Sequence, residues 1–114
     1  NKMAPPEYGQ LYDYLFAQLK ENCPGCTIYV QSLLPVRGRI ANVESAQLNA
    51  NIIEVNRELK TIAHKYGLTY LNLHPSFCDK NGELKVEYSD DGIHPNRVGF
   101  ELWARLLKRP LKRN

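Results

Sequence analysis

Residues 27–34 read TIYVQSLL, a nearly continuous apolar run rich in β-branched and aromatic side chains. Such a run is typical of a strand that is buried on both faces of a parallel sheet. The proline at position 35 ends the run, and the sequence VRGR at positions 36–39 is expected to form a loop. The fold class can be inferred from this strand and from the elements on either side of it.

Helical periodicity flanks the strand on both sides. Residues from about 7 to 21 form one expected helix, which ends at the Pro24-Gly25 turn. Its apolar positions recur at helical spacing and are expected to form the inner face: Leu11, Tyr12, Leu15 and Leu19. After the strand, a longer helix is expected, with Ser45 or Asn42 capping its start and Gly67 capping its end. Its single apolar face comprises Leu48, Ile52, Val55, Leu59, Ile62 and Tyr66.

A second strand and a last helix complete the pattern. Residues 68–73 read LTYLNL and are closed by Pro75, while 79–83 form a polar turn and 89–96 a loop. The last helix is expected from about 97 to 108, where Pro110 stops it. Its inner side is expected to carry Val98, Leu102, Trp103 and Leu106.

The alternation of helices and strands predicts an α/β protein with a parallel sheet. Two strands make a poor sheet, however, because each buried strand needs neighbours on both sides. We therefore expect residues 1–114 to supply only part of one domain, with the missing strands upstream. The expected partner is that missing segment or a second copy of the chain.

Composition excludes several classes of protein. The 114 residues carry 15 Lys and Arg against 12 Asp and Glu, which gives a net charge of +3, too small to predict a nucleic-acid partner. With 43% hydrophobic and 24% charged residues, the chain has an ordinary globular composition and not that of a disordered protein. No stretch approaches the roughly 20 apolar residues of a membrane span.

A carboxylate and an imidazole lie three residues apart in the predicted loop, in the sequence Asp91-Gly92-Ile93-His94. Gly92 allows a tight turn, and Pro95 favours an extended conformation at His94, so the last helix begins after it. The His94 ring can then donate one N–H to Asp91 while its other nitrogen, pointing into a cleft, accepts a proton from a nucleophile. This is the base-and-orienter half of a Ser-His-Asp arrangement, with an expected Asp91–His94 distance of about 2.6–3.2 Å. The alternative is a solvated turn or a helix-capping pair.

The same block carries a family resemblance. Residues 91–96, DGIHPN, followed by Val98-Gly99-Phe100 and Trp103, resemble the last sequence block of the SGNH (GDSL-type) hydrolases. Residues 28–36 and 66–73 are similar to strand units of that family, in the right order. The resemblance implies a three-layer α/β/α, flavodoxin-like fold, of which this chain supplies the C-terminal half. It also implies that Asp91 is the orienting acid and His94 the general base.

The implied activity is carboxylic ester hydrolysis, with no metal or organic cofactor. A small-molecule or glycan ester, such as an acetyl ester of a carbohydrate, is the expected substrate. The family's Gly-Asp-Ser nucleophile block and its Gly-x-Asn-Asp block are absent from these residues, so the nucleophilic serine is expected outside them. The four serines of the chain do not follow Gly-Asp: Ser32, Ser45, Ser76 and Ser89.

Other polar residues have two interpretations each. His74 follows the second strand and either faces the same cleft or is a hydrogen-bonded structural histidine, whereas His64 is expected at the surface. Arg37 and Arg39 either hold an anionic substrate group or are exposed loop residues, and the loop from Ser32 to Arg39 is a candidate pocket wall. A metal set is not supported by the ligand spacing among Asp90, Asp91, His94 and His74.

The cysteines leave a further alternative open. Cys23-Pro24-Gly25-Cys26 can be a redox pair, half a zinc site or a local disulfide, and Cys78 stands apart. Because a redox pair usually opens a helix after a strand, whereas this unit follows a helix, we expect a plain turn or a local disulfide. A non-catalytic packing or glycan-binding module and a thiol redox protein are the alternatives to an esterase.

Overall fold

The computed structural model describes residues 5–40 and 42–112, with side chains described for residues 9–39 and 42–111. The chain divides into two compact units. The first comprises Asn1–Leu33 with Ala50–Asn72, and the second comprises Leu34–Asn49 with Leu73–Asn114. The long helix α2 contributes to both units, because it runs from Ser45 to Lys65.

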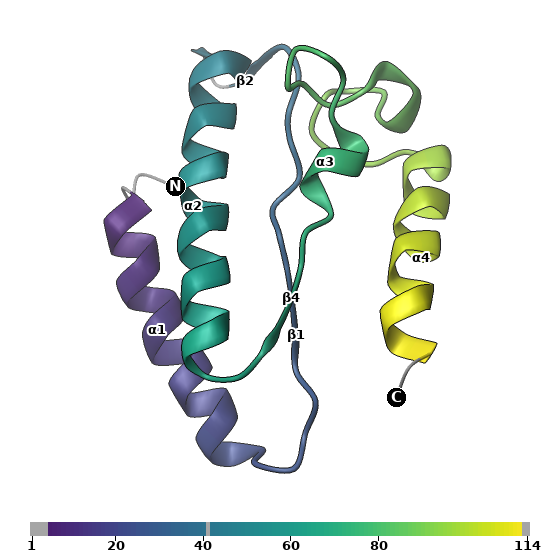
Figure 1. Cartoon of the computed structure of the whole chain (residues 1–114). Coiled ribbons are helices and arrows are strands. Elements are labelled where there is room, and N and C mark those ends of the chain that lie inside the picture. The colour runs from purple at the N-terminus through teal and green to yellow at the C-terminus, as the bar shows by residue number, and fades with distance from the viewer. Residues whose placement is uncertain (1–4, 41, 113–114) are drawn as a thin grey trace. The chain divides into compact units, whose positions relative to one another are not determined.

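The first unit contains a short parallel sheet. Strand β1 (Tyr29–Gln31) pairs in parallel with β4 (Thr69–Leu71), and Val30 lies opposite Tyr70. Helix α1 (Pro5–Asn22) and the Ala50–Lys65 part of α2 lie on the same side of the strand pair (Figure 1). The protein is therefore of the α/β class, with a short parallel sheet flanked by helices, as the sequence predicts.

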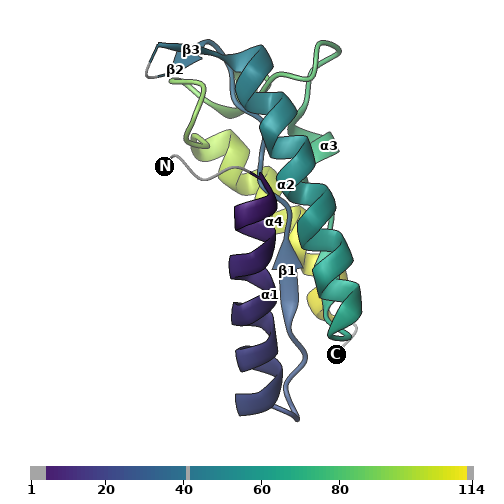
Figure 2. The same ribbon diagram turned by 90° about the vertical axis from the view of Figure 1, so that its left-hand side faces the viewer.

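The core of this unit lies between the helices and the sheet, and Figure 2 shows β1 running alongside α1 and α2. Its buried members come from α1, β1, α2 and the turn before β4: Phe16, Val30, Val55, Leu59, Ile62, Ala63 and Leu68. Tyr70 of β4 is partly buried against them. Burial of this apolar area stabilises the helices, since amphipathic helices of this kind derive most of their stability from packing.

The apolar face of α1 differs from the one predicted. Tyr12 and Phe16 face the core, with ring centroids 5.8 Å apart, whereas the three leucines at helical spacing are 41–44% exposed. These leucines, Leu11, Leu15 and Leu19, form a stripe that we call the α1 leucine stripe. Periodicity finds a helix correctly, but two adjacent apolar stripes match it equally well, and the larger rings occupy the core.

The end of α2 follows the predicted design. Gly67 has a φ of 72°, in the left-handed region that favours glycine. Its N–H donates to the His64 carbonyl, and the N–H of Leu68 donates to the Ala63 carbonyl at 2.8 Å. This is a Schellman motif, which satisfies the last carbonyls of the helix and turns the chain into β4.

The second unit contains two short helices, a hairpin and the last helix. The hairpin pairs β2 (Arg39–Ile40) with β3 (Val43–Glu44), and the short helices are α3 (His74–Phe77) and the 3-10 helix η1 (Val86–Tyr88). The last helix, α4 (Arg97–Lys112), packs on η1. Phe77 is completely buried and meets the Tyr88 ring edge-on at 5.6 Å.

Three local predictions are wrong. The strands are three residues long, shorter than predicted, because only the central part of each apolar run forms the ladder. The hairpin at 39–44 was expected to be loop up to Arg39, and Asn42 makes its turn with a φ of 66°, which asparagine tolerates. Pro110 lies inside α4, where it removes only one backbone donor near the end of the helix.

None of the helices in the described part of the chain combines the length and the apolar character that crossing a bilayer requires.

Candidate active site

Asp91 and His94 are in direct contact in the loop that precedes α4. His94 Nδ1 lies 2.7 Å from Asp91 Oδ2, within the distance that the sequence predicts. The other carboxylate oxygen, Oδ1, accepts the backbone N–H groups of Ile93 and His94, both at 2.8 Å. Asp91 therefore folds its own backbone into a turn and holds the imidazole at the same time. The His94 side chain is 78% exposed, so a substrate or a second segment can reach the ring.

Gly92 and Ser89 make this turn possible. Gly92 has a φ of 85°, and a Cβ there would lie 2.3 Å from the Arg37 carbonyl oxygen, so no other residue fits. Ser89 is completely buried; its Oγ accepts the Gly92 N–H at 2.9 Å and lies 2.7 Å from the His94 carbonyl oxygen, to which it donates. Ser89 thus ties the two ends of the Asp91–His94 turn together.

Asn96 joins this turn to the last helix. Its Oδ1 accepts the Gly99 N–H at 2.9 Å and caps the start of α4, while its Nδ2 donates to Asp90 Oδ1 at 3.1 Å. At Gly99 a Cβ would lie 2.4 Å from the Tyr88 carbonyl oxygen, so only glycine allows α4 to approach η1 this closely. The sequence from Asp91 to Gly99 therefore specifies one local structure that presents the His94 ring at a helix N-terminus.

The surroundings of Asp91 favour its ionised form. The hydrogen bond from the His94 side chain is the largest cause, followed by the backbone N–H groups of His94 and Ile93, and together they hold the Asp91 pKa well below its ordinary value. A carboxylate that stays charged can keep the imidazole in one tautomer and stabilise the imidazolium when a proton arrives.

We expect the Asp91 carboxyl to titrate below its ordinary pKa of 3.8 in a carbon-13 NMR titration. Because the folded-state pKa is lowered, the ionised carboxylate stabilises the fold above pH 3.8, and this contribution is lost as the pH falls through the lower, folded value. His94→Gln should raise the Asp91 pKa, whereas His64→Gln, on the exposed face of α2, should not. An Asp91 pKa that is ordinary in the unmodified protein would contradict this assignment.

His74 contacts a cysteine. Its Nδ1 lies 3.4 Å from the Cys78 sulfur, and burial lowers the pKa of His74. Burial also raises the pKa of the Cys78 thiol, so both groups favour their neutral forms. This contact supports the interpretation of His74 as a hydrogen-bonded structural residue. His64 is exposed on α2, as predicted.

The two loop arginines differ from each other. Arg39 is exposed and pairs with Glu44 at 3.5 Å across the hairpin. Arg37 is half-buried and its guanidinium donates to two backbone carbonyls, those of Leu84 at 3.2 Å and Ser89 at 3.0 Å. The sequence-based alternative of an exposed loop residue is therefore wrong for Arg37.

The Cys23–Cys26 unit forms a turn. No disulfide joins these two cysteines, and the Cys26 N–H donates to the Cys23 carbonyl at 3.1 Å. A hydrogen bond with Cys23 raises the pKa of the Cys26 thiol. Of the two predicted forms, the structure has the plain turn. Among the described residues, no three His, Cys, Asp or Glu side chains gather in a group that could hold a metal ion.

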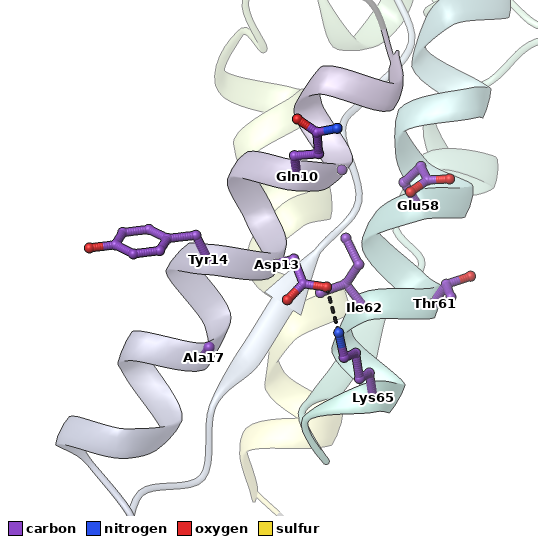
Figure 3. Close-up of a pocket in the computed structure, with 9 residues that line it drawn as sticks. Gln10, Asp13, Tyr14, Ala17, Glu58, Thr61, Ile62 and Lys65 are labelled. Carbon is purple, nitrogen blue, oxygen red and sulfur yellow. Dashed lines mark hydrogen bonds and ion pairs between the residues drawn. The ribbon is translucent and has the colours of Figure 1, made fainter.

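A shallow groove in the first unit lies between α1 and α2 (Figure 3). Its volume is about 770 Å³, and its lining includes Gly9, Asp13, Glu58, Ile62 and Lys65. Asp13 pairs with Lys65 at 2.8 Å, and this hydrogen bond is the main cause of the lowered Asp13 pKa. Lys65 offsets the charge of Asp13 but not that of Glu58, and the lining includes no residue of the Asp91–His94 turn.

The model of the GDSL-like Lipase/Acylhydrolase family matches residues 1–102, so the chain belongs to this family. The match includes the whole Asp91–Gly99 block. None of the proteins of curated function matches the chain.

Solved structures agree in fold. The chain is similar to the esterase domain of the ORF1 protein from the zebrafish ZfL2-1 retrotransposon, with a TM-score of 0.78 and 20% identity over 98% of this chain and 61% of that one. A Streptococcus pneumoniae protein assigned as a platelet activating factor gives a TM-score of 0.81 and 24% identity, and the alignment covers 94% of this chain and 51% of that one. A GDSL-like lipase from Bacteroides thetaiotaomicron gives a TM-score of 0.68 and 21% sequence identity, and the alignment covers 89% of this chain and 52% of the lipase. The chain thus spans between 51% and 61% of these structures, which matches a partial SGNH hydrolase fold.

The residues that support the turn are not evident from the motif itself. Asn96 follows a His-Pro pair and precedes a helix, so its capping role could have been read from the sequence. Ser89 and Arg37 gave no such signal, because Ser89 resembles an ordinary loop serine and the Arg37 side chain reaches 52 residues along the chain to the Ser89 carbonyl.

Proposed function

We propose that this chain supplies the acid and the base of a Ser-His-Asp triad in a carboxylic ester hydrolase. His94 is the general base and Asp91 the residue that orients it. The observation that carries this proposal is the 2.7 Å contact between Asp91 Oδ2 and His94 Nδ1, on an imidazole that is largely exposed. The nucleophilic serine lies outside these residues, and we call the chain together with the segment that carries this serine the completed protein.

The proposed reaction has two halves. His94 Nε2 takes the proton of the serine hydroxyl as the serine oxygen attacks the ester carbonyl, and the resulting imidazolium then protonates the leaving alcohol. This leaves an acyl-serine. His94 next takes a proton from water, whose oxygen attacks the acyl carbon, and returns that proton to the serine oxygen as the carboxylic acid leaves. Asp91 stays ionised and stabilises the imidazolium in both halves.

The hydrogen-bond partners of the chain's own serines support the proposal that the nucleophilic serine lies outside residues 1–114. Three of the four hydroxyls have other partners: Ser32 with Tyr70, Ser45 with Glu83 and Ser89 with the His94 carbonyl. Ser89 is also completely buried, and its hydroxyl is bonded to the His94 backbone. A nucleophile must instead hydrogen-bond to the ring nitrogen of its base.

Exposed apolar surface in both units supports a second half of the domain. The first unit exposes the α1 leucine stripe, and in the second unit Phe100 and Leu111 of α4 are 55% and 51% exposed. The parallel sheet has only two strands in the described residues, so each strand has one edge with no neighbouring strand. Because the similar structures are longer by about two fifths to a half of their length, we propose that the upstream half of the same fold covers these surfaces.

Short-chain esters are the proposed substrates, with acetyl groups on carbohydrates first among them. The test is hydrolysis of p-nitrophenyl acetate and of an acetylated sugar by the completed protein. Turnover of either ester supports an esterase. A folded, completed protein that binds a glycan without turnover would support the alternative, a non-catalytic module.

The cysteine pair should be dispensable for this activity. A Cys23→Ser, Cys26→Ser variant of the completed protein should keep its rate of p-nitrophenyl acetate hydrolysis within a few-fold, because the pair forms a plain turn at the end of α1. The matched control is Cys78→Ser. Loss of several orders of magnitude in the double variant alone, together with insulin reduction by the unmodified protein, would favour a thiol redox function.

A further inference from the structure

Arg37 donates hydrogen bonds to backbone carbonyls on both sides of Asp91 in the sequence. Its guanidinium Nη2 donates to the Ser89 carbonyl at 3.0 Å, before Asp91, and its backbone N–H donates to the Gly92 carbonyl at 2.9 Å, after Asp91. The Arg37 carbonyl also lies so close to Gly92 that a side chain there would overlap it. Asp91 is therefore held between two anchor points that belong to one residue.

The segment that carries Arg37 is itself fixed. The preceding residue, Val36, exchanges two hydrogen bonds with the buried Asn49 side chain of α2, at 2.8 and 2.9 Å. Its carbonyl also accepts the N–H of Leu84 at 3.2 Å. The chain from Val36 to Arg37 thus connects Asn49, near the start of α2, to the turn that presents His94, and it has little freedom to move.

We propose that Arg37 is a positioning residue for the Asp91–His94 pair, which it acts on through the Ser89 and Gly92 carbonyls. This inference rests on the proposed function of that pair as acid and base. The guanidinium suits the task because it donates in a planar fork to two separate carbonyls, those of Leu84 and Ser89, which a lysine ammonium cannot do at the same geometry. Its positive charge interacts with the dipoles of these backbone carbonyls, since none of the ion pairs between described residues includes Arg37.

This role differs from binding an anionic substrate group, the other interpretation of a loop arginine. A substrate-binding arginine affects KM, and only for substrates that carry the anion. A positioning arginine affects kcat for every ester, because a displacement of about 1 Å in a catalytic group can cost about 10²-fold in rate. It also affects the Asp91 environment when no substrate is present.

The test compares Arg37→Lys with Arg39→Lys in the completed protein. Arg39 is a matched control because it lies two residues away, is exposed and pairs only with Glu44 among the described side chains. We expect Arg37→Lys to raise the Asp91 pKa in a carbon-13 NMR titration, because the Ile93 and His94 N–H donors lose their alignment. It should also lower kcat for p-nitrophenyl acetate by about 10- to 100-fold with KM nearly unchanged. Arg39→Lys should change neither quantity.

The outcomes separate this inference from the proposed function. A folded Arg37→Lys variant with an unchanged Asp91 pKa and an unchanged kcat would overturn the positioning role, even if the protein is an esterase. If the Asp91 pKa rises but no variant or parent hydrolyses an ester, Arg37 still holds the Asp91–His94 turn in place, but the proposed function fails and the turn has no catalytic pair to position. If Arg37→Lys does not fold by circular dichroism, the same titration is made on Arg37→Gln. Failure of both to fold would overturn positioning in favour of a purely structural role.

Discussion

His94→Ala is expected to lower kcat for ester hydrolysis by the completed protein by about 10⁴- to 10⁶-fold, the range found for loss of the acid or the base of a Ser-His-Asp triad. The physical reason is that a serine hydroxyl at neutral pH is a poor nucleophile unless a base takes its proton during the attack. The fold should survive, because the His94 side chain is 78% exposed. The measurement is steady-state hydrolysis of p-nitrophenyl acetate, with circular dichroism to confirm folding.

The matched control is His64→Ala, which removes an exposed imidazole from α2 and should leave kcat unchanged. Asp91→Asn should resemble His94→Ala in its effect on kcat, because an amide can stabilise the wrong imidazole tautomer and cannot offset the imidazolium charge. Loss of activity in His64→Ala, or near-normal kcat in a folded His94→Ala variant, would contradict the roles proposed for these histidines.

The second large effect concerns the isolated chain. Residues 1–114 alone should not hydrolyse p-nitrophenyl acetate above background, because the chain carries the base and the acid but not the proposed nucleophile. It should also associate in solution, because the α1 leucine stripe and the apolar residues of α4 remain exposed. Adding the upstream segment that carries the serine should restore hydrolysis and should also prevent the chain from associating with other copies of itself.

Two measurements check this prediction: hydrolysis rate and molar mass by light scattering, each with and without the upstream segment. A variant segment with its serine changed to alanine is the control. It should bind residues 1–114 and prevent their self-association without restoring hydrolysis. A monomeric isolated chain with robust hydrolysis would contradict the account.

Much of the fold could be predicted because helices depend on local periodicity. The steps of three and four from Leu48 to Tyr66 predict one long helix, and α2 runs from Ser45 to Lys65. The same periodicity could not identify the inner face of α1, because Tyr12 and Leu11 lie on adjacent stripes and only the tertiary packing selects between them. The hairpin at 39–44 escaped prediction because its strands are two residues long and show no alternation.

The candidate site was predictable only where its contacts are local. Asp91 and His94 are three residues apart, so a turn with glycine and proline is enough to predict their contact, which is 2.7 Å long. Arg37 and Ser89 were not predicted as its supports, since their hydrogen bond joins residues 52 positions apart. Contacts of that kind depend on the tertiary fold, which a single sequence does not reveal.

The most direct test is to find which serine reacts with a fluorophosphonate, a reagent that phosphonylates activated serines with loss of fluoride. The completed protein and its His94→Ala variant are labelled side by side, digested and mapped by mass spectrometry. We expect one labelled serine, outside residues 1–114, whose labelling is lost in His94→Ala. Labelling of Ser32, Ser76 or Ser89, or equal labelling of the two proteins, would contradict this expectation.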